Sequence, residues 1–163
     1  MKAFLIPETG DFMRKLLVQN VFDKFELVEG EVTTMVTWTV DGSLHKEFYG
    51  EEEETGTPDR DSCLWGEARP VIYEMIKGKK LPVRFSFVLR LPDAGMQRML
   101  EKHQLTQLSE VLSGLFLNIR YQKQTLTCTS GLSYRTFVMD KSMDKIWDEA
   151  VGHFLQQNQI KTE

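Results

Sequence analysis

The segment TWTVDGSLHKEFYGEEEE, residues 37–54, contains the densest group of side chains that could transfer protons or bind a metal. His45 lies between Asp41 and Glu47, and Tyr49 and four consecutive glutamates follow it. Histidine changes its protonation near neutral pH, and carboxylates beside it can orient the ring or bind a cation. Whether these groups form a site depends on which of them share one face of a strand.

The position of the turn decides that face, because a shift of one residue moves every side chain of a strand to the other side. A three-residue turn over 40–42 pairs Trp38 with Leu44 and gathers the apolar side chains of the segment on one face. The same turn places His45 on the outer face. The sequence therefore predicts a hairpin in which His45 is exposed to solvent and has no catalytic role.

The rest of the chain lacks the spacings that mark known catalytic and metal sites. The three histidines are far apart and form no HExxH or Cys/His pattern, so no metal site is expected. No GxxxxGK[ST] loop is present, and the acidic run 51–54 lacks the spacing of an EF-hand loop. Cys128 alternates with polar residues in a strand pattern that places it in the core, where a thiol is unreactive. We therefore expect no catalytic residue, no metal and no cofactor.

The composition is typical of a globular domain that folds around one core. The chain has 163 residues, of which 41% are hydrophobic and 27% charged, and its net charge is −4. This length favours a single domain over 1–163. No apolar run reaches the length of a membrane span and no signal-peptide pattern is present, so we expect a cytoplasmic protein. Cys63 and Cys128 are far apart and are expected to be reduced.

Apolar spacing and turn residues predict an α+β protein with antiparallel β-meanders and short helices. The segment 25–40 is predicted to form one bent strand or two. An acidic surface loop, 50–62, and a connecting helix, 65–78, separate two β-rich halves. A long amphipathic helix, 142–158, follows them, and its wide apolar stripe is expected to pack on the core. A homomeric interface along that stripe is the alternative.

The two halves repeat the same order of elements. FLIPETGDFMRKLL, residues 4–17, parallels LRLPDAGMQRMLEK, residues 89–102, in its proline, its acid and its glycine. A β-meander follows each helix, which suggests two βαββ(β) repeats, 1–49 and 81–140. The alternative is that two α+β halves share common patterns by chance.

This order of elements resembles one domain of a DNA sliding clamp, which is built from two βαβββ repeats with an outer sheet and inner helices. The second half carries the closer resemblance, in RFSFVLRLP (84–92), LNIRYQKQTLTCTSG (117–131) and SYRTFVMD (133–140). Separately, TVDGSLHKEFY (39–49) together with WGEARPVIYEMIKGKK (65–80) resembles an uncharacterised family of small proteins from anaerobic Firmicutes bacteria. The helices outside the repeats depart from the clamp pattern, and the family resemblance implies no known activity.

One group of candidate binding residues is basic. Arg14 and Lys15 on the first short helix, and Arg98 and Lys102 on the second, would face nucleic acid if the clamp resemblance holds. Contacts from these residues to phosphates would make binding dependent on salt and independent of base sequence. The alternative is that they form the ordinary polar faces of amphipathic helices.

A second group of candidates, Arg69, Tyr73 and Glu74, lies on the connecting helix. A pocket beside this helix would make the protein a small enzyme or a ligand-binding module. Because no catalytic pattern is found, we instead expect a non-catalytic interaction or scaffold protein. We expect it to bind a protein partner or itself, with nucleic acid as a further partner class and no membrane association.

Overall fold

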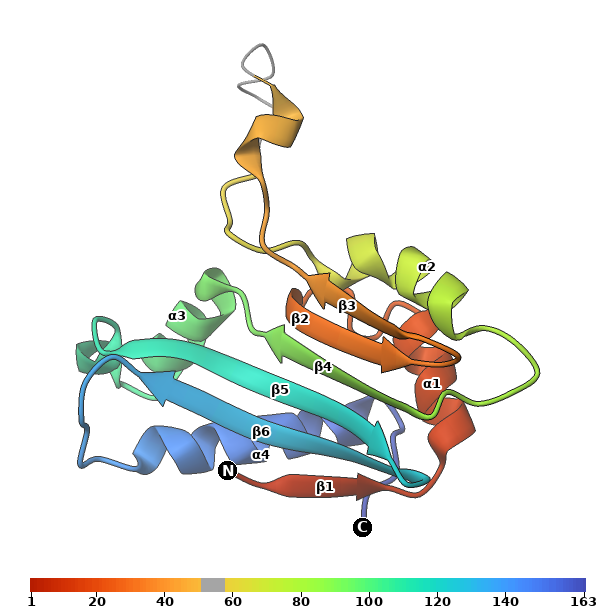
Figure 1. The fold of residues 1–163 in the computed structure, drawn as a ribbon. Helices are drawn as coiled ribbons and strands as arrows, with labels where there is room; N and C mark the ends of the chain where they lie inside the picture. The colour runs from red at the N-terminus through yellow and green to blue at the C-terminus, as the bar shows by residue number, and fades with distance from the viewer. Residues whose placement is uncertain (51–57) are drawn as a thin grey trace.

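Six antiparallel strands form one sheet in the residues that the structure describes, which are 1–50 and 58–163 (Figure 1). The structure is a computed structural model. The strands lie in the order β1-β6-β5-β4-β2-β3, so β1 and β3 form the two edges. In chain order the elements are β1 (Ala3–Ile6), α1 (Thr9–Leu17), β2 (Glu26–Thr33), β3 (Thr37–Asp41), a 3₁₀ turn (Lys46–Tyr49), α2 (Trp65–Ile76), β4 (Arg84–Arg90), α3 (Asp93–Lys102), a 3₁₀ turn (Thr106–Leu108), β5 (Leu112–Gln122), β6 (Thr125–Tyr134) and α4 (Ser142–Gln157). The predicted α+β class is confirmed.

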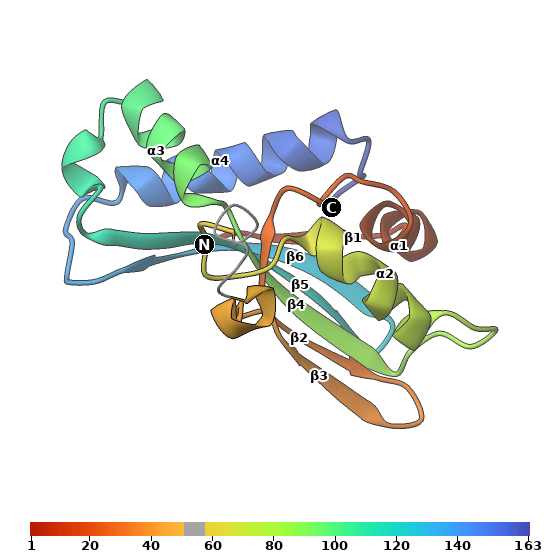
Figure 2. The ribbon, with the colours of Figure 1, turned by 90° about the horizontal axis from the view of Figure 1, so that it is seen from above.

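The four helices of the described residues pack on one face of this sheet, where they form a single hydrophobic core with it (Figure 2). α4 lies against β6, α2 against β2, and α3 against β5. α1 packs beside α2, far from α3 in both views of the ribbon (Figures 1 and 2). None of these helices has the length and apolar composition that crossing a membrane requires.

The sequence of β4, RFSFVLR, explains why the helices cover only one face. Phe85, Phe87 and Leu89 are buried beneath them, whereas Arg84 and Ser86 are exposed on the opposite side. Successive side chains of a strand alternate between the two faces, so apolar residues at every second position specify one covered face. The other face is polar and carries no helix in the described part of the chain.

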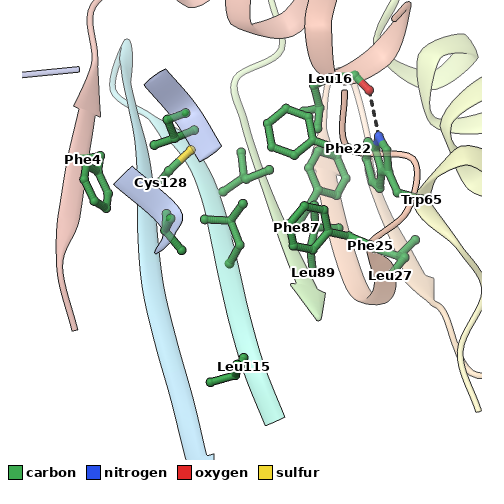
Figure 3. Close-up of a cluster of buried hydrophobic side chains, with 14 of the residues drawn as sticks. Phe4, Leu16, Phe22, Phe25, Leu27, Trp65, Phe87, Leu89, Leu115 and Cys128 are labelled. Atoms are coloured by element: carbon green, nitrogen blue, oxygen red, sulfur yellow. Dashed lines mark hydrogen bonds between the residues drawn. The ribbon is translucent and has the colours of Figure 1, made fainter. Parts of the chain in front are cut away.

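Trp65, the first residue of α2, fixes that helix to the sheet (Figure 3). Its ring is fully buried and meets the ring of Phe87 edge-on, with 4.9 Å between centroids. Its indole N–H donates to the carbonyl oxygen of Leu16 at 2.8 Å, which satisfies the polar atom inside the core. One side chain thus ties α1, α2 and β4 together.

The apolar stripe of α4 belongs to the core. Met143, Trp147, Val151 and Leu155 are all buried against the sheet. The alternative of a homomeric interface along this stripe is therefore not supported.

The hairpin predicted around 40–42 is wrong. β3 pairs back with β2, Trp38 lies opposite Val32, and the turn falls at Thr34-Met35-Val36. The segment 25–40 thus forms two strands. The reason for the error is that the true turn contains no glycine, proline, asparagine or aspartate, the residues that usually mark a turn.

Gly42 has a different role from the predicted turn. Its N–H donates to the carbonyl oxygen of Val28 at 3.0 Å, and a Cβ at this position would lie 1.8 Å from the carbonyl oxygen of Leu27. The glycine allows two backbones to approach closely. Beyond it the chain leaves the sheet. Phe48 therefore has no face of the sheet to pack on, and its side chain is 84% exposed.

The predicted exposure of His45 is confirmed. Its side chain is 73% exposed, and its Nδ1 lies 3.5 Å from the carboxylate of Glu47, which is also exposed. No second carboxylate or cation pairs with His45 in the described residues. The absence of a catalytic role for His45 stays a prediction.

The two edges of the sheet differ. At β1, the Leu5 N–H donates to the carbonyl oxygen of Glu163 at 3.2 Å, and the Glu163 N–H donates to the carbonyl oxygen of Leu5 at 2.9 Å. At β3, no other described segment pairs with the outer side of the strand. One edge is therefore partly covered and the other is open.

The predicted acidic loop, 50–62, lies partly outside the described residues. Its last part returns to the sheet, where the Leu44 N–H donates to the carbonyl oxygen of Asp61 at 2.8 Å. The proposed repeats correspond to the orders β1-α1-β2-β3 and β4-α3-β5-β6. Because β1 pairs with β6 and not with a strand of its own half, the two halves form one sheet, and their duplication stays a prediction.

Candidate functional site

A charged cleft of about 800 Å³ lies at the end of the sheet where β4 leads into α3. One wall is the segment 59–64 that returns from the acidic loop. The other wall comes from the start of α3, the start of β5 and the residue after β6, Arg135. The cleft is lined by four acidic and four basic side chains: Glu26, Asp59, Asp61, Asp93, Lys46, Arg60, Arg90 and Arg135.

Glu26 and Arg90 form a partly buried ion pair within this cleft. The two residues face each other across β2 and β4, and an Arg90 nitrogen lies 3.2 Å from a Glu26 oxygen. The Glu26 side chain is only 8% exposed. Burial raises the pKa of the Glu26 carboxyl above its ordinary value, while the hydrogen bond and the charge of Arg90 oppose that rise.

The Arg90 guanidinium also holds the neighbouring elements. It donates to Asp93 at 2.7 Å and to the carbonyl oxygen of Ser113 at 3.0 Å. Gly114 makes room for it, because a Cβ there would lie 3.1 Å from the Arg90 Nε and 2.7 Å from the ring of Phe116. Arg90 thus joins β2, α3 and β5 at one point.

The wall formed by 59–64 is held by contacts within the molecule. Arg60 pairs with Glu67 of α2 and donates to the carbonyl oxygen of Ser62 at 3.0 Å. Lys46 donates to the carbonyl oxygens of Pro58 and Arg60 at 2.6 and 2.8 Å. Arg135 donates to the carbonyl oxygen of Glu110 at 3.1 Å, so all four basic side chains of the cleft are already engaged inside the protein.

A second concave surface, of about 440 Å³, is the groove between α3 and α4. Its floor is apolar and its rim is basic. The floor is formed by Met99, Ile146, Ala150 and Phe154, and the rim by Arg98, Lys102, His103 and His153 with one acid, Glu149. Neither Arg98 nor Lys102 forms an ion pair with another described residue. The charge of this rim is therefore available to a ligand.

The first basic helix differs from the second. Lys15 is buried, donates to the carbonyl oxygen of Gln159 at 2.8 Å and pairs with Asp11 at 2.9 Å. Arg14 also pairs with Asp11, at 2.8 Å. Because α1 and α3 lie at opposite ends of the helical layer, these two residues do not join Arg98 in one basic surface (Figure 2).

The three candidates on α2 do not gather in one pocket. Arg69 forms a bidentate pair with Asp23, with both distances 2.8 Å, and so fixes α2 to the chain before β2. Glu74 pairs with Lys77 at the helix end. Tyr73 lines a groove of about 230 Å³ between the ends of α1 and α2, and Arg14 lines the same groove. Of the three candidates, Tyr73 lines this groove, and Arg69 and Glu74 do not.

The two cysteines are unpaired in the structure, as predicted, and burial raises the pKa of both thiols. Cys128 is fully buried and Cys63 is half-buried. We expect a thiol reagent such as DTNB to label Cys63 slowly in the native protein at pH 8, and Cys128 only after unfolding, because the thiolate is the reactive form. A Cys63→Ser variant is the control, since it should then show no native labelling. Rapid labelling of that variant would contradict the core position of Cys128.

Sequence reasoning missed the Glu26–Arg90 pair. In FELVEGEV the three glutamates look alike, and nothing in their spacing separates the buried one from the two on the sheet surface. The distinguishing contact is tertiary: the segment after the acidic loop bridges Glu26 at Leu64. The residues around Glu26 in the sequence therefore do not reveal that its side chain is buried.

The chain matches one family model. No curated protein and no solved structure shows significant similarity to the chain. A family model described as "Family of unknown function (DUF5721)" matches residues 15–163, which include every strand and helix except β1 and the start of α1. The expected membership of an uncharacterised family is thus confirmed, and the chain belongs to this family of unknown function, DUF5721.

Proposed function

We propose that the protein is a non-catalytic interaction protein that binds an acidic, partly apolar segment of a protein partner in the groove between α3 and α4. The observation that carries the proposal is the combination of an apolar floor with a basic rim. Arg98 and Lys102 stand on this rim without an acidic partner among the described residues. An acidic segment with apolar side chains would complement both features.

The charged cleft gives weaker support for a binding role. Its acids and bases are equal in number, and Arg60 and Arg90 are already paired with acids of the same molecule. A ligand would have to replace those contacts, at a cost in free energy. Binding of a small charged molecule there is the second candidate function, and the buried Glu26 carboxylate is the observation that favours it.

Nucleic acid is a less suitable partner for the groove than a protein. Phosphate binding needs an extended basic surface, and α1, which carries Arg14, lies at the other end of the helical layer from α3, which carries Arg98. A clamp-like ring would also need α1 and α3 to present their basic side chains together. The apolar floor, in contrast, suits leucine or phenylalanine side chains of a bound peptide.

The test measures binding of a fluorescein-labelled peptide of glutamate, leucine and alanine by fluorescence anisotropy, with a DNA duplex as the second probe. We expect the double variant Arg98→Glu, Lys102→Glu to weaken peptide binding at least about tenfold. The matched control is Lys79→Glu, Lys80→Glu, which makes the same change in net charge at two exposed positions between α2 and β4, neither of which lines the groove. Equal loss in both variants, or stronger binding of the duplex than of the peptide, would contradict the proposal.

A further inference from the structure

We propose that two copies of this chain join through strand β3, edge to edge and antiparallel, so that their sheets become one continuous sheet. The proposed dimer axis passes beside Thr39. This surface is separate from the groove between α3 and α4, so the inference does not depend on the proposed partner of that groove.

Every second residue of β3 points its backbone N–H and C=O groups away from β2, and no other described segment pairs with these groups. The Gly42 N–H donates to Val28 at 3.0 Å, and the Thr34 N–H donates to Val36 at 2.9 Å. In an antiparallel pair, hydrogen-bonded positions alternate with non-bonded ones. With the observed register, Val36, Trp38 and Val40 therefore turn their backbone groups toward β2. The backbone N–H and C=O groups of Thr37, Thr39 and Asp41 consequently point away from the sheet.

Apart from its short length and the charge of Asp41 at its end, the strand lacks most of the features that usually prevent an edge from pairing. Natural edge strands are protected by proline, lysine, a bulge or a covering segment. TWTVD, residues 37–41, contains no proline and no lysine, and its pairing with β2 has no register shift. The other edge of the same sheet, at Leu5, is covered by Glu163. Among the residues that the structure describes, the open edge is thus specific to β3.

Only one register uses all the free groups of both copies. If Thr39 lies opposite Thr39 of the second copy, then Thr37 lies opposite the second copy's Asp41, and all three outward residues of each strand can bond. A register centred on Asp41 would place two like charges directly opposite each other, which is unfavourable. Charge and hydrogen bonding therefore favour the same two-fold arrangement.

The side chains of β3 suit this register as well. Trp38 lies on the helix side of the sheet, opposite the buried Val32, yet it is 41% exposed, and Val36 beside it is 46% exposed. In the proposed dimer Trp38 faces Val40 of the second copy, an aromatic and β-branched pair that stabilises neighbouring strands. The partner that covers these apolar side chains is therefore a second copy of the same strand.

The native mass by light scattering gives the first test. We expect a concentration-dependent dimer of twice 18.9 kDa, and the variant Thr39→Pro should halve that mass. Proline at position 39 removes only an outward N–H, which an edge strand tolerates, so the variant should keep its circular dichroism spectrum. A monomeric wild-type protein at all concentrations, or a Thr39→Pro variant that is folded and dimeric, would overturn the proposal.

A disulfide test fixes the register and does not depend on the proline variant. In a Cys63→Ser background, Thr39→Cys should form a disulfide-linked dimer on mild oxidation, because opposite residues of an antiparallel pair lie within disulfide distance. Thr37→Cys is the matched control, since its opposite residue is Asp41 of the second copy and no cysteine pair forms. Cross-linking of Thr37→Cys but not of Thr39→Cys would overturn the register.

Discussion

Replacement of Gly42 by alanine is expected to lower the free energy of unfolding by at least about 3 kcal/mol. The added methyl would lie 1.8 Å from the carbonyl oxygen of Leu27 and 3.2 Å from that of Val28, both of which are backbone atoms. A backbone cannot rotate away as a long side chain can. The close contact between β2 and the chain that follows β3 would have to open, and the hydrogen bond from the Cys63 N–H to the carbonyl oxygen of Gly42, at 2.8 Å, would be lost.

Urea unfolding followed by tryptophan fluorescence measures this change. Gly10→Ala is the matched control, because Gly10 lies in α1 and a Cβ there meets no atom within 4 Å. That substitution should stabilise the protein by about 0.5 kcal/mol, since alanine favours the helix. A loss below about 1 kcal/mol in Gly42→Ala would mean that the two backbones are not in close contact.

Replacement of Arg90 by methionine is expected to cost about 3 kcal/mol at pH 8, because it leaves the buried Glu26 carboxylate without its partner. The effect depends on pH. The pKa of Glu26 is already raised by burial, and loss of Arg90 removes the contribution that lowers it. A carboxyl group with a raised folded-state pKa destabilises the protein when ionised, and this penalty disappears as the pH falls through that pKa. The deficit of the variant should therefore be largest at pH 8 and smaller in acid.

The control for this variant lies on the same strand. Arg84 approaches Glu31 only to 3.9 Å, and both side chains are about half exposed, so Arg84→Met should change stability by less than about 0.5 kcal/mol. Unfolding in urea at several pH values compares the two variants. A deficit of Arg90→Met that stays constant from pH 8 into the acid range would show that the ionised Glu26 is not its cause.

Much of the fold could be predicted from apolar spacing. β4 alternates over its whole length, and the apolar residues of α4 recur at helical intervals, so each element specifies its own buried face. The helix predicted for 142–158 spans Ser142–Gln157, and the connecting helix predicted for 65–78 spans Trp65–Ile76. These signals are local, and local patterns are what a sequence displays directly.

The connections between elements were harder to predict. Asp41-Gly42 looks like a turn, yet the glycine is needed because its backbone lies close to that of Leu27, which is more than ten residues earlier in the chain. The real turn at Thr34-Met35-Val36 consists of residues that favour strands. The sequence therefore predicted Trp38 inside a hairpin that does not form, whereas the structure has it on the edge strand of the sheet.

The candidate sites show the same limit. Arg98 and Lys102 could be selected because both lie on one amphipathic helix, but most of the apolar floor beside them comes from α4, about fifty residues later. Lys15 has the same residue type and helical setting, and only its contact with the backbone of Gln159 shows that it is structural. Tertiary contacts therefore decide which basic residues remain available.

The pairing of β1 with β6 has a consequence for how the chain acquires its structure. Phe4 lies opposite Cys128, so β1 has no strand to join until residues far along the chain have been synthesised. β2 and β3 can form their hairpin early, and β4 can add to it, whereas β1, which precedes them in the chain, is the last of the six strands to join the sheet. Such distant pairing slows folding, because a long loop must close before the contact stabilises it. During synthesis, Phe4 and Ile6 therefore stay exposed longer than any other strand residues of the core, and a chaperone that recognises short apolar segments would bind there first.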